Sequence, residues 1–267
     1  GGIPMKKLIT LLTAALVMAA LAVPVSAQEE ARIHLIHGIP DTPVDVVAGG
    51  DVVFGDFQFG DTQDLSALAG QTLVGLQVRL AGTETVAIDA GDTALPASGN
   101  YTIVAHLNAE GVPTLAVFEN DTSSIDAGEG RLIVRHTAQA PAVDVKANGA
   151  VAFADLTNPN SVQADLPVGT ISAEVVPADA DEPVVIGPVD LPIEDGSALI
   201  VYAVGSLDAG SVTALTESIT GLGTAPTAVN TGNSPVGTSV PVWAAGLGAL
   251  LLVAVVAGRR SVVEVRS

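Results

Sequence analysis

The segments RIHLIHGIPDTPVDV (32–46) and RLIVRHTAQAPAVDV (131–145) carry an Arg, a His and a Val-Asp-Val at the same spacing. Each shared residue of the second segment follows its counterpart by 99 positions, and later glycine, phenylalanine and aspartate residues keep this register. Solenoid repeats are much shorter, at roughly 20–50 residues. The sequence therefore predicts a tandem duplication, with one domain over residues 31–120 and a second over residues 130–220.

Each repeat consists of short apolar segments separated by turn residues. In the first repeat these include residues 33–37, LVGLQVRL (73–80), YTIVAHL (101–107) and TLAVF (114–118), and the third of them aligns with ALIVYAV (198–204) in the second repeat. No amphipathic helical pattern interrupts the series. The pattern predicts an all-β protein with two tandem antiparallel β-sandwich domains of the immunoglobulin-like kind.

The N-terminal residues have the pattern of a secretory signal. After residues 1–4, Met5 begins a basic segment, a short apolar run follows, and Val-Ser-Ala ends at Ala27. This order of basic, apolar and small residues predicts that residues 1–27 are a signal peptide cleaved after Ala27. The alternative is an N-terminal anchor that stays on the protein.

The C-terminal residues predict a membrane anchor. Residues 240–258 carry no charge and are long enough to cross a bilayer as a helix. Two arginines begin residues 259–267, so the positive-inside rule places that tail in the cytoplasm. Residues 221–239 read as a flexible stalk. Within the stalk, Thr231-Gly232 resembles a sortase cleavage site that would link the body to the cell wall, although its Leu and Pro positions hold Ala and Val; the alternative is a plain stalk.

The chain is strongly acidic, with 10 Lys and Arg against 29 Asp and Glu and a formal net charge of −19. This charge disfavours nucleic acid and anionic lipid headgroups as partners. The chain has no cysteine, so no disulfide stabilises the domains. Between the predicted signal peptide and the predicted anchor, the basic residues are Arg32, Arg79, Arg131, Arg135 and Lys146.

The repeated motif resembles a known family. Each copy reads R-x-x-x-x-H, then a Pro-containing turn, Val-Asp-Val, a Gly turn and an apolar strand. This order is similar to the tandem domain of unknown function 4397, and the resemblance covers about residues 31–218. The family occurs in secreted and cell-envelope proteins of bacteria. The resemblance implies a β-sandwich and a surface location, but it implies no catalytic residues.

The repeated histidines are the first candidates for chemistry. His37 and His136 each precede an aspartate, Asp45 and Asp144, by eight residues, and a His–Asp pair can orient an imidazole for proton transfer. No nucleophile motif accompanies either pair. Strand alternation places both histidines at the end of an inward-facing stripe, where the ring can hydrogen-bond the following turn. We therefore favour a structural role for both.

The repeated arginines and the acidic loops are further candidates. Arg32 and Arg131 begin the same strands on the opposite face, so a cross-strand ion pair with Asp45 or Asp144 is expected. His34 and His37 point to opposite faces of a strand, which argues against zinc. Two loops gather oxygen ligands without an EF-hand pattern, so calcium stays open beside a merely solvated acidic loop. These loops contain Asn120, Asp121, Asp126 and Glu129, and Asp179, Asp181 and Glu182.

The sequence therefore predicts a non-enzymatic protein of the cell envelope, without a cofactor. A single-pass helix anchors the protein in the membrane, and its body lies outside the cell. The body acts as a structural or interaction module, for example in adhesion, with an envelope protein or polysaccharide as partner. The alternatives are a secreted hydrolase that uses the duplicated His–Asp pair and a carbohydrate-binding module. Sugar sites usually stack on aromatic rings, and the only tryptophan of the chain lies in the predicted membrane helix.

Overall fold

The computed structural model describes residues 30–224. The predicted signal peptide, the stalk from residue 225 with Thr231 and Gly232, the membrane helix 240–258 and the tail 259–267 lie outside the described residues. Among the residues that the structure describes, none of the helical segments is long and apolar enough to cross a bilayer. The described residues form one compact unit that ends at Thr224.

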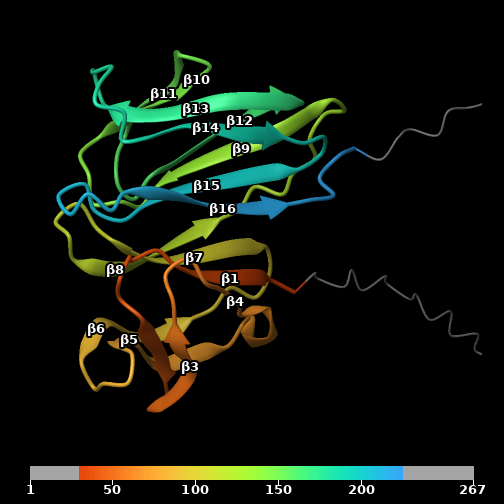
Figure 1. The fold of residues 1–267 in the computed structure, drawn as a ribbon. Coiled ribbons are helices and arrows are strands. Elements are labelled where there is room, and N and C mark those ends of the chain that lie inside the picture. The colour runs from red at the N-terminus through yellow and green to blue at the C-terminus, as the bar shows by residue number, and fades with distance from the viewer. Residues whose placement is uncertain (1–29, 225–267) are drawn as a thin grey trace, which may run out of the picture. The chain divides into compact units, whose positions relative to one another are not determined.

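Sixteen strands follow one another in two sets of eight (Figure 1). The first repeat contains β1 (Arg32–His37), β2 (Val44–Ala48), β3 (Asp51–Phe57), β4 (Thr62–Asp64), the short 3-10 helix η1 (Ser66–Leu68), β5 (Thr72–Leu80), β6 (Val86–Ala94), β7 (Asn100–Leu107) and β8 (Pro113–Glu119). The second contains β9 (Glu129–His136), β10 (Val143–Ala147), β11 (Ala150–Leu156), β12 (Ser161–Pro167), β13 (Gly169–Pro177), β14 (Ile186–Ile193), β15 (Ala198–Val204) and β16 (Thr213–Ile219).

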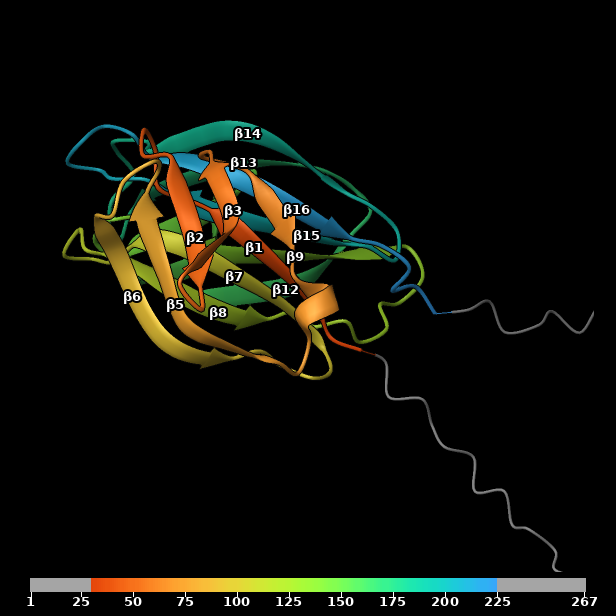
Figure 2. The ribbon, with the colours of Figure 1, turned by 90° about the horizontal axis from the view of Figure 1, so that it is seen from below.

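Both repeats build two four-stranded sheets with the same strand order. The first repeat has sheets β4-β1-β7-β8 and β3-β2-β5-β6, and the second has β12-β9-β15-β16 and β11-β10-β13-β14. Figure 2 shows the sheet β3-β2-β5-β6 from its outer side. All strand pairs are antiparallel except β1 with β7 and β9 with β15, which are parallel. The prediction of an all-β protein with antiparallel-rich sheets is confirmed.

The immunoglobulin-like detail of that prediction is wrong. In an immunoglobulin sandwich the first and second strands share a sheet. Here β1 and β2 lie in different sheets, and so do β9 and β10. The reason is the connection after β1, where the buried ring of His37 bonds the carbonyl of Thr42 and the chain crosses between the sheets instead of forming a hairpin.

The strand pairing also shifts one part of the sequence alignment by a residue. Leu35 of β1 pairs with Ile103 of β7, and Val134 of β9 pairs with Val201 of β15. Ile103 therefore corresponds to Val201, one position later than in the alignment of residues 101–107 with 198–204. A shift by one residue exchanges the two faces of a strand, so the equivalence of core positions follows from the pairing alone.

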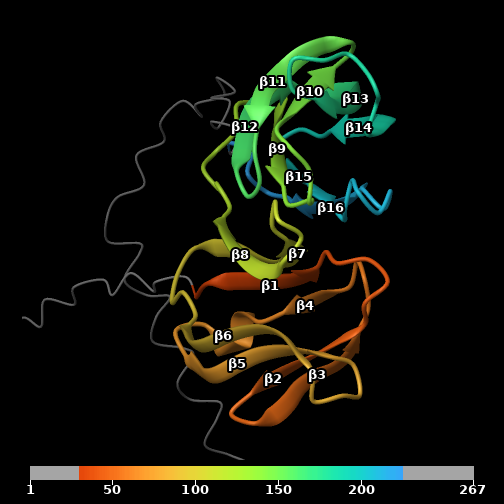
Figure 3. The same cartoon turned by 90° about the vertical axis from the view of Figure 1, so that its left-hand side faces the viewer.

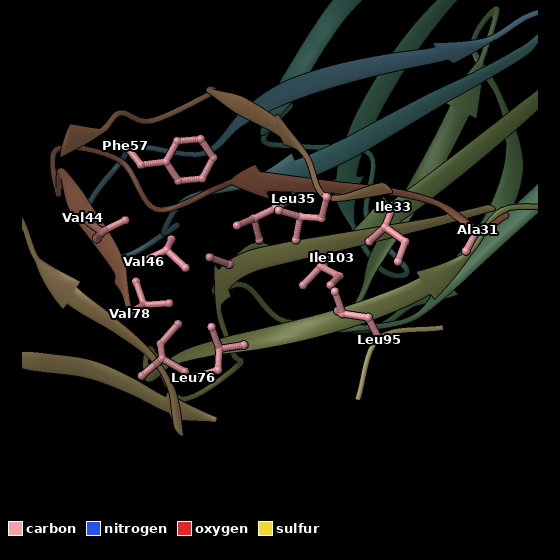
Figure 4. Close-up of a cluster of buried hydrophobic side chains, with 13 residues drawn as sticks. Ala31, Ile33, Leu35, Val44, Val46, Phe57, Leu76, Val78, Leu95 and Ile103 are labelled. Atoms are coloured by element: carbon pink, nitrogen blue, oxygen red, sulfur yellow. The ribbon is translucent and has the colours of Figure 1, made fainter. Parts of the chain in front are cut away.

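The described residues contain three apolar cores. One lies inside each sandwich, and the first of these is drawn in Figure 4. The third lies between the sandwiches, where the sheet β4-β1-β7-β8 packs on the sheet β12-β9-β15-β16 (Figure 3). Its fully buried side chains come from both repeats, and they are Ile36, Val104, Ile133, Ala198, Ile200, Tyr202 and Val204. Because all three cores lie within residues 30–224, this segment contains what it needs to fold by itself.

The segment that joins the two repeats is also packed against the body. Ile125 is fully buried, and its amide donates a hydrogen bond to the carbonyl of Leu222 at 2.8 Å. Ile125 also forms an isolated bridge with Gly223 beyond the last strand. The connection between β8 and β9 is therefore held at the end of the second sandwich.

Candidate functional sites

The repeated histidines hold the turns that follow their strands. His37 lies at the end of β1, and its Nε2 donates to the carbonyl of Thr42 at 2.7 Å. His136 lies at the end of β9, and its Nε2 donates in the same way to the carbonyl of Pro141 at 3.0 Å. Both rings are buried, and burial lowers the pKa of each below the ordinary value. In both repeats the imidazole therefore holds the turn that follows its strand.

The repeated aspartates have different partners from the histidines. The carboxylate of Asp45 accepts hydrogen bonds from the amides of Asp56 at 2.8 Å and Gly82 at 2.9 Å. These two amide hydrogen bonds lower the pKa of Asp45. In the second repeat, Asp144 accepts from the amides of Asp155 at 2.9 Å and Asp179 at 3.3 Å. The His–Asp pairs of the sequence are therefore not hydrogen-bonded pairs in the structure.

Both aspartates fix an irregular backbone. Asp56 and Asp155 have positive φ angles of 52° and 54°, which non-glycine residues seldom adopt. Each follows a register shift between the second and third strands of its repeat. Each carboxylate accepts one hydrogen bond from the amide of this residue and a second from an amide in the next hairpin turn. It therefore stabilises both the bulge and the turn.

Replacement of Asp45 by alanine is expected to release these two amides. Amide hydrogen exchange at Asp56 and Gly82 should become faster by roughly tenfold, because each amide loses its charged acceptor. Exchange rates measured by NMR would show the change, with Asp51→Ala at an exposed carboxylate of β3 as the control. Unchanged protection at both amides would show that the Asp45 carboxylate does not hold the bulge.

The repeated arginines do not pair with the repeated aspartates. Arg131 is buried and forms a two-pronged ion pair with Asp165, with Nε–Oδ1 at 2.7 Å and Nη2–Oδ2 at 2.9 Å. This pair raises the pKa of Arg131. Arg32 is exposed, and the structure records no ion pair for it within residues 30–224. The expected pairing with Asp45 or Asp144 is wrong because β2 and β10 lie in the opposite sheets, whereas β12 lies beside β9.

One carboxylate in each of the two acidic loops has protein partners, Asp121 in the first loop and Asp181 in the second. The Asp121 carboxylate accepts the amide of Ser123 at 2.9 Å, and hydrogen bonds from Ser123 lower the pKa of Asp121 to about 2. Asp181 forms an ion pair with Lys146 at 2.7 Å. Within residues 30–224, no three His, Asp or Glu side chains are placed to hold a metal ion together. Calcium binding stays a prediction from composition.

A cluster of buried polar side chains lies between the two sandwiches, and the repeat pattern did not reveal it. Arg135 of β9 is 1% exposed, and its guanidinium donates to the Tyr202 hydroxyl at 2.9 Å and to Asn120 Oδ1 at 2.6 Å. It also lies over the Phe118 ring of the first sandwich, 4.4 Å from the centroid. The cluster therefore joins residues of both repeats.

Glu217 of β16 completes this cluster. Its carboxylate accepts from the hydroxyls of Tyr202 at 2.7 Å and Thr102 at 2.9 Å, and it forms an ion pair with His34 of β1. Burial raises the pKa of Tyr202, and burial lowers the pKa of Arg135. We call Arg135, Tyr202, Glu217, Thr102, His34 and Asn120 the interdomain cluster.

The interdomain cluster lies at positions where the two repeats differ. Arg135 corresponds to Ile36 of the first repeat, and Glu217 corresponds to Phe118 through the strand pairing. A search for repeated polar residues therefore misses both. One feature of the sequence does point to the interdomain cluster, which is the arginine inside the apolar strand LIVRH (132–136). A charged side chain at a buried strand position needs a polar partner, so this arginine indicates a buried polar contact.

The second sandwich contains an apolar cavity that the first one lacks. The space between the sheets measures about 400 Å³ in the second repeat and about 30 Å³ in the first. The cavity is lined mainly by aliphatic side chains together with the ring of Phe153, and its polar lining residues are Lys146, Thr213 and Thr216.

Comparison with known proteins gives one family. Residues 31–146 match the family described as "Domain of unknown function (DUF4397)". The matched residues cover the first sandwich, strand β9 and all but the last residue of β10. No curated protein matches the sequence.

Proposed function

Because the chain belongs to the DUF4397 family through residues 31–146, a family without a known activity, we propose a function from the fold and the candidate sites. The protein is a non-catalytic module of the cell envelope. Two sandwiches form one body outside the membrane, and the C-terminal segment anchors it. The body acts as a structural or interaction module toward an envelope protein or polysaccharide.

The hydrogen bonds of the repeated residues carry this proposal. His37 and His136 donate to turn carbonyls, and Asp45 and Asp144 accept backbone amides. A hydrolase would need its histidine beside a nucleophile and an orienting carboxylate. In the part of the chain that the structure describes, each of these four side chains instead holds its own repeat in shape.

The surface supports an interaction module over a sugar-stacking module. The seven Phe and Tyr residues of the chain all lie in the described part, and none of them is classed as exposed. Stacking on a sugar ring requires an exposed aromatic face. The core and the interdomain cluster that the two sandwiches share also favour a body that acts as one rigid unit.

The proposed location has a direct test. Cells that produce the full chain with one epitope tag after Ala27 and another after Ser267 are treated with a protease from outside. We expect loss of the first tag and survival of the second, because the anchor would place them on opposite sides of the membrane. Lysed cells, in which both tags should be lost, are the control. Survival of both tags in intact cells, with the chain in the soluble fraction, would contradict the proposal.

A further inference from the structure

We propose that the second sandwich binds an uncharged aliphatic ligand in the cavity between its two sheets. The inference rests on a comparison within one molecule. Two sandwiches share the same strand order, yet one is filled by its own side chains and the other holds a cavity of about 400 Å³. This proposal does not depend on the location or the anchoring of the protein.

The cavity exists because large side chains of the first repeat are small in the second. Val46 and Val145 are equivalent in the two repeats, and they pair with Val78 and Val175, so Val78 is equivalent to Val175. Two residues earlier on the same strands, Leu76 is therefore equivalent to Ala173. In the same way, Ala105 pairs with Leu115 in the first repeat, and the equivalent Ala203 pairs with Ala214 in the second. Leu115 is therefore equivalent to Ala214. Leu76 is buried in the first core, which Leu115 also packs against, while both alanines line the cavity. Figure 4 shows Leu35, Leu76 and Ile103 filling the first sandwich.

A further element fills the first sandwich and has no counterpart in the second. Leu65 and Leu68, at the short helix η1 between β4 and β5, pack into the first core. In the second repeat β12 ends at Pro167 and β13 begins at Gly169, so no such turn exists. Leucine side chains therefore occupy the space in one sandwich. A ligand that takes their place in the other must offer the same aliphatic surface.

The lining of the cavity reaches the edge formed by β14 and β16. In the first sandwich the corresponding strands β6 and β8 contact each other and close this edge, whereas β14 contacts β9 and β15. Ile186 and Gly187 from β14, with Val212 and Thr213 at the start of β16, line the cavity at this edge. A ligand can enter there without separating the hydrogen-bonded strands of either sheet.

The charges around the cavity favour an uncharged ligand. Lys146 is the only charged residue of the lining, and its ammonium is already paired with Asp181 at 2.7 Å. Glu174 and Asp144 also act on this ammonium. A carboxylate ligand would have to displace Asp181 within a strongly acidic protein, so an aliphatic chain with a neutral end fits better.

The test uses residues 28–224, which contain all three cores, and a matched set of ten-carbon ligands. Decanol, decanoate and decyltrimethylammonium have the same chain and differ in charge. We expect decanol to shift the methyl NMR signals of Val134, Val175 and Val201 and to leave those of Val46 and Ile103 in the first sandwich unchanged. We also expect decanoate to bind more weakly than decanol.

The variant A173L/A214L restores the two leucines of the first repeat. It should bind decanol at least about tenfold more weakly, because its side chains take the space of the ligand. Ala154→Leu on the exposed side of β11 is the control and should bind as the original protein does. If the double variant does not fold, the proposal is tested by the methyl NMR shifts that decanol causes in the unaltered protein. The proposal is overturned if decanol shifts neither set of methyls or both sets equally, if decanoate binds more tightly, or if the folded double variant keeps its affinity.

Discussion

Replacing Arg135 by alanine is expected to lower the free energy of unfolding by about 3–5 kcal/mol, because the variant loses a large buried side chain together with its hydrogen bonds. The guanidinium is buried between the sandwiches, where it bonds Tyr202 and Asn120 and lies over Phe118. Its removal leaves a cavity, takes a donor away from the Tyr202 hydroxyl and Asn120 Oδ1, and removes a positive charge that acts on Glu217. Urea unfolding of residues 28–224 measures the change.

The same variant tests whether the two sandwiches unfold together. The third core and the interdomain cluster predict one cooperative transition for the original protein, and loss of Arg135 should separate it into two. Arg79→Ala is the matched control, because Arg79 pairs with Glu84, which is 89% exposed, and such a pair contributes at most about 1 kcal/mol. Equal losses for the two arginine variants would contradict a special role for the interdomain cluster.

Acidification is expected to destabilise the body strongly below pH 6.5. His37, His106 and His136 are buried, and burial lowers the pKa of all three below the unfolded value of 6.5. Below pH 6.5 the unfolded chain therefore binds protons that the folded chain does not, and stability falls with pH. Each histidine contributes up to about 1.4 kcal/mol per pH unit, and the three together up to about 4 kcal/mol per pH unit, until the pKa values of the folded protein are reached.

The histidine effect is separable from that of the carboxylates. The pKa values of Asp45 and Asp121 are lowered below 3.8, so these groups favour the folded state above that pH and lose this contribution only in stronger acid. Unfolding free energies between pH 7.5 and 5 thus report the histidines. His136→Gln should reduce the slope by about one third. A stability that does not change between pH 7.5 and 5 would contradict this, because it would mean that the histidines titrate with the same pKa in the folded and unfolded chains.

Much of the fold follows from local pattern. The short alternating segments and the turn residues predicted an all-β protein, and the structure is built from the sixteen strands β1–β16. The alternation also placed His37 and His136 on inward faces. The sheet order was not predictable in this way, because one alternating pattern suits several strand orders. The choice depends on how the segment after β1 crosses between the sheets.

The ion pairs and the polar cluster could not be obtained from spacing. Asp165 follows Arg131 by 34 residues and meets it because β12 lies beside β9. Arg135 and Glu217 meet residues of the first repeat only after the two sandwiches pack together. The equivalent residues of the first repeat are apolar, so a search for residues that recur in both repeats does not find Arg135 or Glu217.

The sequence by itself determined what depends on neighbouring residues: the duplication, the β-strands, the acidic charge and the turns beside each repeated histidine. Only the tertiary structure decided which strands share a sheet, which charges are buried, that a third core joins the two repeats, and that one sandwich is filled while the other holds a cavity. The physical reason is that side-chain periodicity fixes which face of a strand is apolar, whereas packing depends on volumes and partners contributed by residues far apart in the chain.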